Sequence, residues 1–373
     1  MNPQLARPLA TLLLLAGWVS PLPAQKWQVQ YFYDKAKTTF QIADLQFPSP
    51  TRGIAVGVIT NEKEHQEPTS VVTSDGGAHW QTVAIKEPPV SLFFLNENTG
   101  WMVTTKGLWQ TSEAGRTWTK LPKIPNTIIR VHFLDEQHGF AIGSKKTALE
   151  THDAGITWQP LDLSATASGE NINYTAYTWI DFATPKVGLI TGWNNPPNRY
   201  GPDLPDWVDP AVTLHQRVPP HITYTVATYV GAQTWKASAG SLFGVVTRVR
   251  LHADGTGLGL IDYGQSFRYP SEVYSIKWPP GTTHTVYRDS KFAVTDIWQA
   301  SDGTAYLAGI VIKGQLRSLI PTPVQVLTSK DLKDWKPIPV DYRAEATTAI
   351  LAAAGDDNLW MATNTGMILK LVR

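Results

Sequence analysis

The stretch Thr73-Ser-Asp-Gly-Gly-Ala-His-Trp80 decides the fold, because two sharp copies of it follow along the chain. The copies are Thr111-Ser-Glu-Ala-Gly-Arg-Thr-Trp118 and Thr151-His-Asp-Ala-Gly-Ile-Thr-Trp158, so that the closing tryptophan recurs about every 40 residues. Weaker copies, Thr228 to Trp235 and Thr328 to Trp335, keep the first threonine and the tryptophan but lose the Asp and Gly positions. A period of about 40 to 50 residues, built of short strands and turns, is typical of a propeller or a similar array.

The repeated stretch predicts a turn between two antiparallel strands. Its carboxylate can accept hydrogen bonds from N–H groups that the turn leaves unpaired, and its glycine adopts a backbone geometry that side chains disfavour. The tryptophan then opens the next strand and packs between sheets. The residues with these structural roles are Thr73, Asp75, Gly77, Trp80, Thr111, Glu113, Gly115, Trp118, Thr151, Asp153, Gly155 and Trp158.

A second repeat, a short apolar strand introduced by glycine or a small turn, precedes the first. It occurs seven times, beginning at Gly53, Gly100, Gly139, Gly188, Gly257, Gly303 and Asn358. Another strand with an aromatic residue near its end comes before each of the clearer copies, as in Leu45-Gln-Phe47 and Val131-His-Phe133. One module therefore predicts a four-stranded antiparallel blade.

The last module stops at Arg373 one strand short. The segment Lys26-Trp-Gln-Val-Gln30 resembles the strands that follow the repeated turns, so we expect it to complete the last blade, since closure pairs edges that an open sheet would expose. The predicted fold is all-β, a seven-bladed propeller of four-stranded antiparallel blades closed by an N-terminal strand. Six or eight blades remain open, because the fifth module has no recognisable turn motif.

The composition agrees with an all-β protein. The chain has 15 Trp, 13 Tyr, 28 Gly and 27 Pro in 373 residues, and aromatic strands punctuated by Gly and Pro favour sheet over helix. The net charge of +1 gives no bulk attraction to nucleic acid or acidic membranes. There is no cysteine, hence no disulfide framework, no thiol nucleophile and no lipid-attachment cysteine. We expect no cofactor and no metal, because the nine histidines show no close metal-ligand spacing.

Residues 1–24 are predicted to be a signal peptide. Arg7 precedes an apolar stretch from Leu9 to Val19, and Pro21-Leu-Pro-Ala24 supplies a small residue for cleavage. The apolar stretch is shorter than the roughly 20 residues of a membrane span, although an uncleaved anchor is the alternative. We therefore expect a single propeller domain over residues 25–373, without a transmembrane span, located in a periplasm or outside the cell.

A Pro-rich insertion is predicted in blade four at residues 193–222, where the distance between successive turn tryptophans is longest. Long loops on a rigid scaffold often carry binding sites, but such a loop can equally cover a blade edge. Both interpretations are kept.

Candidate binding residues are the polar ones on inner strands, because these strands line the channel of a propeller and alternation turns every second side chain toward it. They are Gln46, Arg130, His132 and Asp181. A second candidate surface is a basic strip of Arg248, Arg250, Arg268 and Arg288, which could also be a solvated face. Three acidic residues on or beside inner strands, Asp44, Asp181 and Asp296, could serve catalysis, although channel polarity or turn hydrogen bonds are the favoured explanation.

The turns resemble the BNR or Asp-box repeat, and their combination with the apolar Gly strand resembles the photosystem II stability and assembly factor-like propellers within the sialidase-like superfamily. The resemblance covers nearly the whole chain after the leader, most clearly residues 40 to 160. It implies a non-catalytic scaffold that binds an unidentified protein partner in the cell envelope during assembly of membrane complexes. The two degraded turns and the insertion in blade four depart from the family pattern.

The alternative function is a secreted glycoside hydrolase of the sialidase-like type, with a carbohydrate as ligand. Sialidases carry an early Arg-Ile-Pro, and here the nearest string is Lys123-Ile-Pro125, which lacks the arginine. A glycosidase of another kind needs two facing carboxyl groups at about 5 Å or at 6.5 to 9.5 Å, a separation that a sequence does not provide. Whether the chain is an enzyme is left open at this point, with the scaffold favoured.

Overall fold

The computed structural model describes residues 25–122, 124–161, 172–194, 221–229, 234–242, 244–263, 269–277, 281–312 and 320–373. The predicted signal peptide, Arg268 and most of the blade-four insertion lie outside these ranges. Among the described residues, no helix has the length and apolar character needed to cross a bilayer. The helical element in these ranges is one 3-10 turn, η2 (Ile172–Tyr174).

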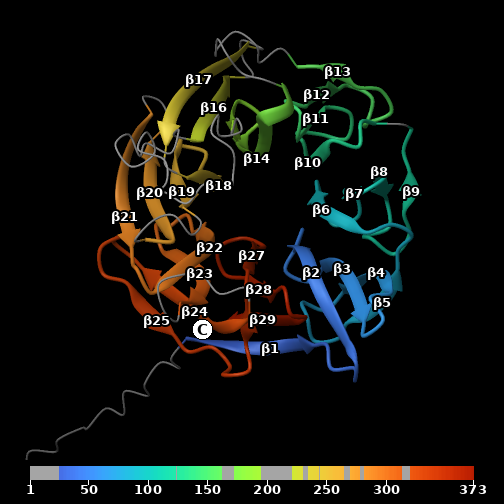
Figure 1. The fold of residues 1–373 in the computed structure, drawn as a ribbon, viewed down its shortest axis with the longest axis vertical. Helices are drawn as coiled ribbons and strands as arrows, with labels where there is room; N and C mark the ends of the chain where they lie inside the picture. Colours follow the sequence, from blue (N-terminus) through green and yellow to red (C-terminus); the bar gives the residue numbers. More distant parts are fainter. Residues whose placement is uncertain are drawn as a thin grey trace, which may run out of the picture.

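The described strands form seven antiparallel sheets arranged as blades around a ring (Figure 1). The all-β propeller architecture predicted from the repeats is therefore confirmed. Blades one to three are β2 (Thr38–Gln46), β3 (Gly53–Asn61), β4 (Gln66–Thr73), β5 (Gln81–Ala84); β6 (Pro89–Phe94), β7 (Gly100–Thr104), β8 (Gly107–Thr111), β9 (Thr119–Lys120); and β10 (Ile128–Phe133), β11 (Gly139–Gly143), β12 (Ala148–Thr151), β13 (Gln159–Pro160).

Blades four to six follow in the same strand order. They are β14 (Thr175–Thr184), β15 (Val187–Asn194), β16 (His221–Tyr229), β17 (Thr234–Leu242); β18 (Val245–Leu251), β19 (Thr256–Asp262), β20 (Ser271–Lys277), β21 (Thr282–Arg288); and β22 (Phe292–Gln299), β23 (Ala305–Val311), β24 (Thr322–Ser329), β25 (Lys336–Ile338). The insertion thus falls between β15 and β16, the second and third strands of blade four.

Blade six corrects the prediction that every blade has four strands. A fifth strand, β26 (Glu345–Ala346), pairs with Thr322 and Pro323 at the start of β24. The short β25 pairs only with Val326 to Thr328, which leaves the start of β24 without a partner on that side. The chain leading to the last blade fills this edge, as expected if unpaired strand edges are unfavourable.

Blade seven is completed from the other end of the chain. Its strands are β27 (Ala349–Ala353), β28 (Leu359–Thr363) and β29 (Met367–Val372), and β1 (Lys26–Phe32) pairs with β29 as the outermost strand. The register sets Trp27 opposite Leu371 and Phe32 opposite Met367. The prediction that the N-terminal strand closes the ring is therefore correct.

The repeated turn forms a hydrogen-bonded unit between the third and fourth strands. In blade one, the Thr73 hydroxyl accepts the Gly77 N–H at 3.0 Å and donates to Asp75 Oδ1 at 2.9 Å. Hydrogen bonds from the His79 backbone N–H and imidazole, together with the Thr73 hydroxyl, lower the pKa of Asp75 to about 2. The Trp80 indole then donates to the Gly77 carbonyl at 3.1 Å. Blade three repeats these contacts through Thr151, Asp153, Gly155 and Trp158.

The copy in blade six was predicted to lack the Asp position, and this is wrong. Ser329 rather than Thr328 supplies the hydroxyl, which lies 3.0 Å from Asp331 Oδ1, and Asp331 accepts the N–H groups of Lys333 and Asp334. The motif is shifted by one residue and shortened before Trp335, so that an alignment on the threonine concealed it.

In blades one to three, the aromatic residue at the end of the inner strand explains the glycine that opens the next strand. A Cβ on Gly53 would lie 2.3 Å from the Phe47 ring, and one on Gly139 would lie 2.4 Å from the Phe133 ring. The Phe133 ring stacks on Trp101 of the preceding blade, with centroids 3.6 Å apart, and meets Trp158 of its own blade edge-on. The Phe, Gly and Trp positions thus pack together within a blade, and the Phe133–Trp101 stack adds a contact with the preceding blade.

We expect the Trp27→Ala variant to lose about 3 to 5 kcal/mol of unfolding free energy, because the indole is 3% exposed in the strand that closes the ring. Urea denaturation of the full chain measures this loss. Lys26→Ala, an exposed change in the same strand, is the control and should shift the stability by less than about 0.5 kcal/mol. Equal losses for the two variants would contradict a packing role for Trp27.

Candidate binding site in the central channel

The inner strands bring polar side chains to the channel in two rows, and a β-bulge aligns them. In blades one, three, five and six the pairing skips one residue before Asp44, Arg130, Arg248 and Asp296, which face Val56, Ile142, Leu260 and Ala308 at equivalent positions of the second strand. Two residues further along the strands of blades one, three and five lie Gln46, His132 and Arg250, and Asp181 holds the equivalent position in blade four. Bulges re-aim side chains, and here they place charged groups in register around the ring.

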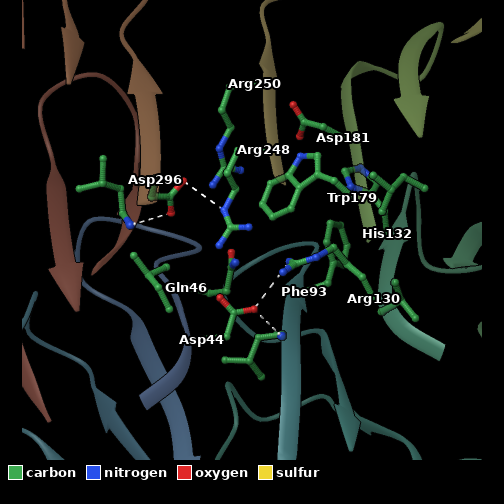
Figure 2. A pocket seen from close by; sticks show the side chains of 15 residues that line it. Asp44, Gln46, Phe93, Arg130, His132, Trp179, Asp181, Arg248, Arg250 and Asp296 are labelled. Atoms are coloured by element: carbon green, nitrogen blue, oxygen red, sulfur yellow. Dashed lines mark hydrogen bonds and ion pairs between the residues drawn. The ribbon is translucent and has the colours of Figure 1, made fainter. Parts of the chain in front are cut away.

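These residues surround one cavity of about 100 Å³, shown in Figure 2. All seven inner strands contribute, including β6 through Leu92 and Phe93 and β27 through Ile350 and Leu351. The structure therefore assembles most of the residues singled out from the sequence: Asp44, Gln46, Arg130, His132, Asp181, Arg248, Arg250 and Asp296. They came from three separate predictions: the polar channel residues, the basic strip and the acidic candidates.

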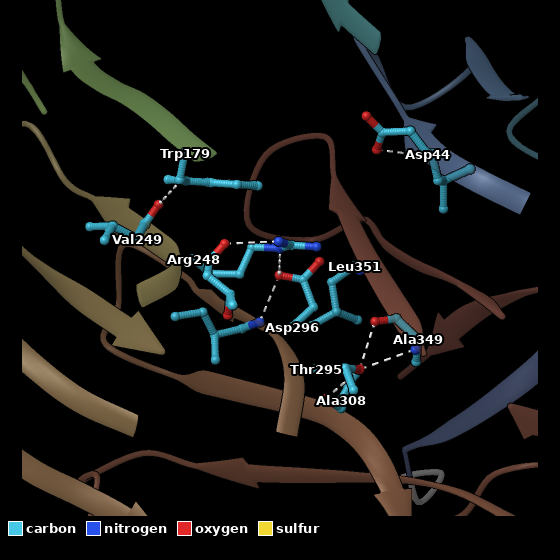
Figure 3. Close-up of polar contacts among 12 residues, drawn as sticks. Asp44, Trp179, Arg248, Val249, Thr295, Asp296, Ala308, Ala349 and Leu351 are labelled. Atoms are coloured by element: carbon cyan, nitrogen blue, oxygen red, sulfur yellow. Dashed lines mark hydrogen bonds and ion pairs between the residues drawn. The ribbon is translucent and has the colours of Figure 1, made fainter. Parts of the chain in front are cut away.

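The three aspartates connect neighbouring blades. Asp44 Oδ2 accepts the Leu92 N–H at 2.9 Å, Asp181 Oδ2 accepts the Leu251 N–H at 3.1 Å, and Asp296 Oδ2 accepts the Leu351 N–H at 2.9 Å. In each case the donor belongs to the inner strand of the next blade. Figure 3 shows Asp296 beside Arg248 and Leu351. Asp44 and Asp296 also accept the N–H of the following residue through Oδ1. The carboxylates thus satisfy buried backbone donors, a structural use that the sequence analysis kept as an alternative.

Three arginines gather around Trp179, which the sequence analysis did not single out. The guanidinium carbons of Arg130, Arg248 and Arg250 lie 4.3, 4.5 and 5.0 Å from the indole centroid, within the range of a cation–π interaction. The indole is held by its N–H, which donates to the Val249 carbonyl at 2.8 Å. Trp179 occupies the row of Asp44 and Arg130, two residues before Asp181, so strand alternation was the signal that could have found it.

Carboxylates neutralise these cations only in part. Arg248 Nε lies 3.3 Å from Asp296 Oδ1, and Arg130 lies 3.8 Å from Asp44 Oδ2. The buried Nε of Arg250 has no hydrogen-bond partner among the described residues. Burial lowers the pKa of Arg130 to about 10; Asp44 opposes this effect, while Arg248 and Arg250 add to it. The arginines therefore retain capacity to donate to an anionic group entering the cavity.

Burial and the nearby arginines shift the pKa values of the two remaining titratable groups, His132 and Asp181. Burial, Arg130 and Arg250 lower the pKa of His132 to about 3, so the imidazole is neutral near pH 7. Its ring lies between Phe93 and Phe182, with centroids 4.6 and 4.9 Å away. Burial raises the pKa of Asp181, while Arg250 and the N–H groups of Leu251 and Phe182 oppose that rise.

The basic strip does not form as predicted. Arg248 and Arg250 lie on the inner strand β18, whereas Arg288 lies on the outer strand β21, where it donates to Glu272 at 2.7 Å. Two strands separate the positions, which sequence proximity could not reveal. Arg268 falls outside the described residues.

The fold and this site define a closed β-propeller with an arginine-rich, partly neutralised channel. A family model described as photosynthesis system II assembly factor YCF48 matches residues 120–195. The photosystem II assembly lipoprotein Ycf48 of Trichormus variabilis is 25% identical over 245 residues, which cover 62% of this chain and 68% of that protein. The resemblance to the photosystem II assembly factor-like propellers is therefore confirmed.

Solved structures agree on the fold. YCF48 from Cyanidioschyzon merolae superimposes with a TM-score of 0.58 at 16% identity, covering 93% of this chain and 98% of that chain. A structure of YCF48 bound to D1 peptide gives a TM-score of 0.58 at 16% identity, covering 92% of this chain and 99% of that chain.

We expect stability to depend on pH through His132. Because its pKa falls from 6.5 to about 3 on folding, only the unfolded chain takes up the proton between these values, so stability is lost as the pH falls below 6.5. From about pH 7 to pH 5 the wild type should lose up to about 2 kcal/mol more than His132→Phe. Urea denaturation at both pH values measures the difference, and parallel losses would contradict a neutral buried imidazole.

We expect Asp296→Asn to lose about 3 to 5 kcal/mol of unfolding free energy, because it leaves Arg248 unpaired and presents an amide to a backbone N–H. The matched control is Asp357→Asn, whose carboxylate also pairs with an arginine but is 89% exposed, and which should lose under about 1 kcal/mol. Denaturation of both variants provides the comparison. A fully stable Asp296→Asn would argue against a blade-bridging role.

Proposed function

We propose that this chain is a non-catalytic propeller that binds a protein partner and acts in the assembly or stabilisation of a membrane protein complex. The proposal draws on the resemblance to Ycf48, a protein named for photosystem II assembly and solved with a D1 peptide. The observation that carries it for this chain is the cluster of Arg130, Arg248 and Arg250 around Trp179 in the channel cavity.

The cavity suits an acidic segment of a protein. Its aspartates already accept backbone N–H groups of the neighbouring blades, whereas the guanidinium groups keep donors available. Arginine and tryptophan are also the side chains that most often dominate binding at protein interfaces. At about 100 Å³ the cavity accommodates one side chain or a chain end, so most of the contact area would come from the surrounding blade loops.

We place this activity on the exported side of a membrane, in agreement with the leader predicted at residues 1–24. The relative from Trichormus variabilis is named a lipoprotein. This sequence contains no cysteine, so attachment through a lipidated cysteine is not part of the proposal.

Glycoside hydrolysis is not favoured. A glycosidase needs one carboxyl group that gives a proton and a second that acts as nucleophile or base. Asp44 and Asp296 each accept two backbone hydrogen bonds, and Asp181 accepts one from the next blade. These bonds hold the carboxylates to the blades and away from a substrate role.

The test is affinity capture from a detergent-solubilised membrane fraction of the source organism, with captured proteins identified by mass spectrometry. Wild type should retain a membrane-complex subunit, and Arg130→Gln and Arg250→Gln should each reduce its recovery at least about 5-fold. Arg116→Gln, which removes the same charge from the exposed turn of blade two, should not. Unchanged recovery with both channel variants would contradict the proposal, as would turnover of aryl glycosides by the wild type.

A further inference from the structure

A cluster of potential metal ligands lies at one end of blade three, away from the channel. His138 Nε2 is 2.7 Å from Glu150 Oε1, and His152 Nε2 is 3.6 Å from the same oxygen. The ligand atoms of the three residues all lie within 4.8 Å of one another. Within the described ranges this is the one group of three such side chains.

The strand register places the three side chains on one face of the blade. Phe140 on β11 is opposite Glu150 on β12, and Gly139 is opposite Thr151, so the next step outward brings His138 opposite His152. Since side chains alternate along a strand, positions 138 and 140 share a face, as do 150 and 152. The hairpin therefore brings together residues whose spacing in the sequence does not match a local metal-binding motif. For this reason no metal was predicted from the sequence.

Ring contacts and backbone hydrogen bonds fix the position of His138 in the cluster. The His138 ring lies 5.0 Å from the buried Phe140 ring and 4.5 Å from the His152 ring. Asp135 Oδ1 accepts the N–H groups of Gln137 and His138 at 2.8 and 2.7 Å, which fixes the turn that carries His138. The side chains of His138 and Glu150 are 23% and 28% exposed, whereas His152 is 68% exposed, so the group is partly preformed and accessible to an ion.

We propose that His138, Glu150 and His152 bind a divalent transition metal ion of the Zn²⁺ class, with at least one coordination position open. Two imidazoles and a carboxylate suit zinc and similar ions better than Mg²⁺ or Ca²⁺, which take oxygen ligands. Zn²⁺ binds imidazole nitrogen and carboxylate oxygen at about 2.0 to 2.2 Å, so the ligand atoms of one tetrahedral ion lie about 3.4 Å apart. A small side-chain rotation closes the remaining gap and exchanges the His138–Glu150 hydrogen bond for metal coordination.

The open coordination position determines what else the site can bind. Three protein ligands leave a tetrahedral ion one position for water or for a donor from another molecule, unlike a closed four-ligand structural site. The geometry suits an ion held at one end of blade three, with a histidine or carboxylate of a partner protein as its fourth ligand. This site is independent of the channel and does not rest on the function proposed above.

Isothermal titration of the full chain with ZnCl₂, after chelator treatment and without a polyhistidine tag, tests the proposal. Wild type should bind one Zn²⁺, and His138→Ala, Glu150→Gln and His152→Ala should each weaken binding by about 100-fold or more, since even residues that only orient ligands typically cost 10- to 100-fold. Titration with CoCl₂ gives a second readout, because Co²⁺ held by nitrogen ligands develops visible absorption bands that the variants should lose.

His79→Ala is the matched control. His79 pairs with Asp75 at 2.7 Å in the equivalent turn region of blade one, which makes one histidine and one carboxylate without a second histidine. It should leave the affinity unchanged. Circular dichroism confirms that the variants fold, and His152→Ala, which truncates the most exposed member, keeps the comparison valid if His138→Ala does not. Absence of Zn²⁺ binding by the wild type, or binding that survives Glu150→Gln and His152→Ala, would overturn the proposal.

Discussion

The pairing of β1 with β29 is the constraint on which the rest of the structure depends. Seven blades enclose a channel only if the first and last meet, and the last blade obtains its outer strand from the beginning of the described chain. Trp27 then becomes part of a core that includes Leu351, Met361 and Leu369 of blade seven. Because each blade packs on its neighbours, an open ring would expose a strand edge. The inner strands would then no longer be held in fixed positions around the channel.

Within the closed ring, the aspartates and arginines of the channel have different tasks. Asp44, Asp181 and Asp296 each accept a backbone N–H of the next blade, so their carboxylates stabilise the contact between blades, and those of Asp44 and Asp296 also pair with arginines. The arginines are held by the face of Trp179 and by incomplete ion pairs. A net charge of +1 for the whole chain therefore conceals a local concentration of cationic donors, the kind of field that selects an anionic ligand.

The repeats predicted the fold because they act within one blade or between adjacent strands. Gly53 and Phe47 show this: glycine opens β3 because the Phe47 ring of the same blade lies over it. The Ser329–Asp331 turn was missed because its hydroxyl and carboxylate residues are shifted by one position from the repeated pattern, although they make the same hydrogen bond. The Asp296–Leu351 bond and the gathering of arginines around Trp179 could not be predicted, because they depend on contacts between blades. The separation of Arg288 from Arg248 depends on the strand order within blade five, which closeness in the sequence does not reveal.

The segment matched by the YCF48 family model, residues 120–195, contains structural and chemical residues side by side. Phe133, Gly139 and the turn from Thr151 to Trp158 shape a blade, and any propeller of this kind needs such positions. Arg130 and Trp179 lie in the same segment, on the inner strands β10 and β14, and their side chains line the cavity that a ligand would enter. The match thus accounts for the scaffold, and the case for binding stands on the channel: cations desolvated by the ring are stabilised further when an anion replaces the water they have lost.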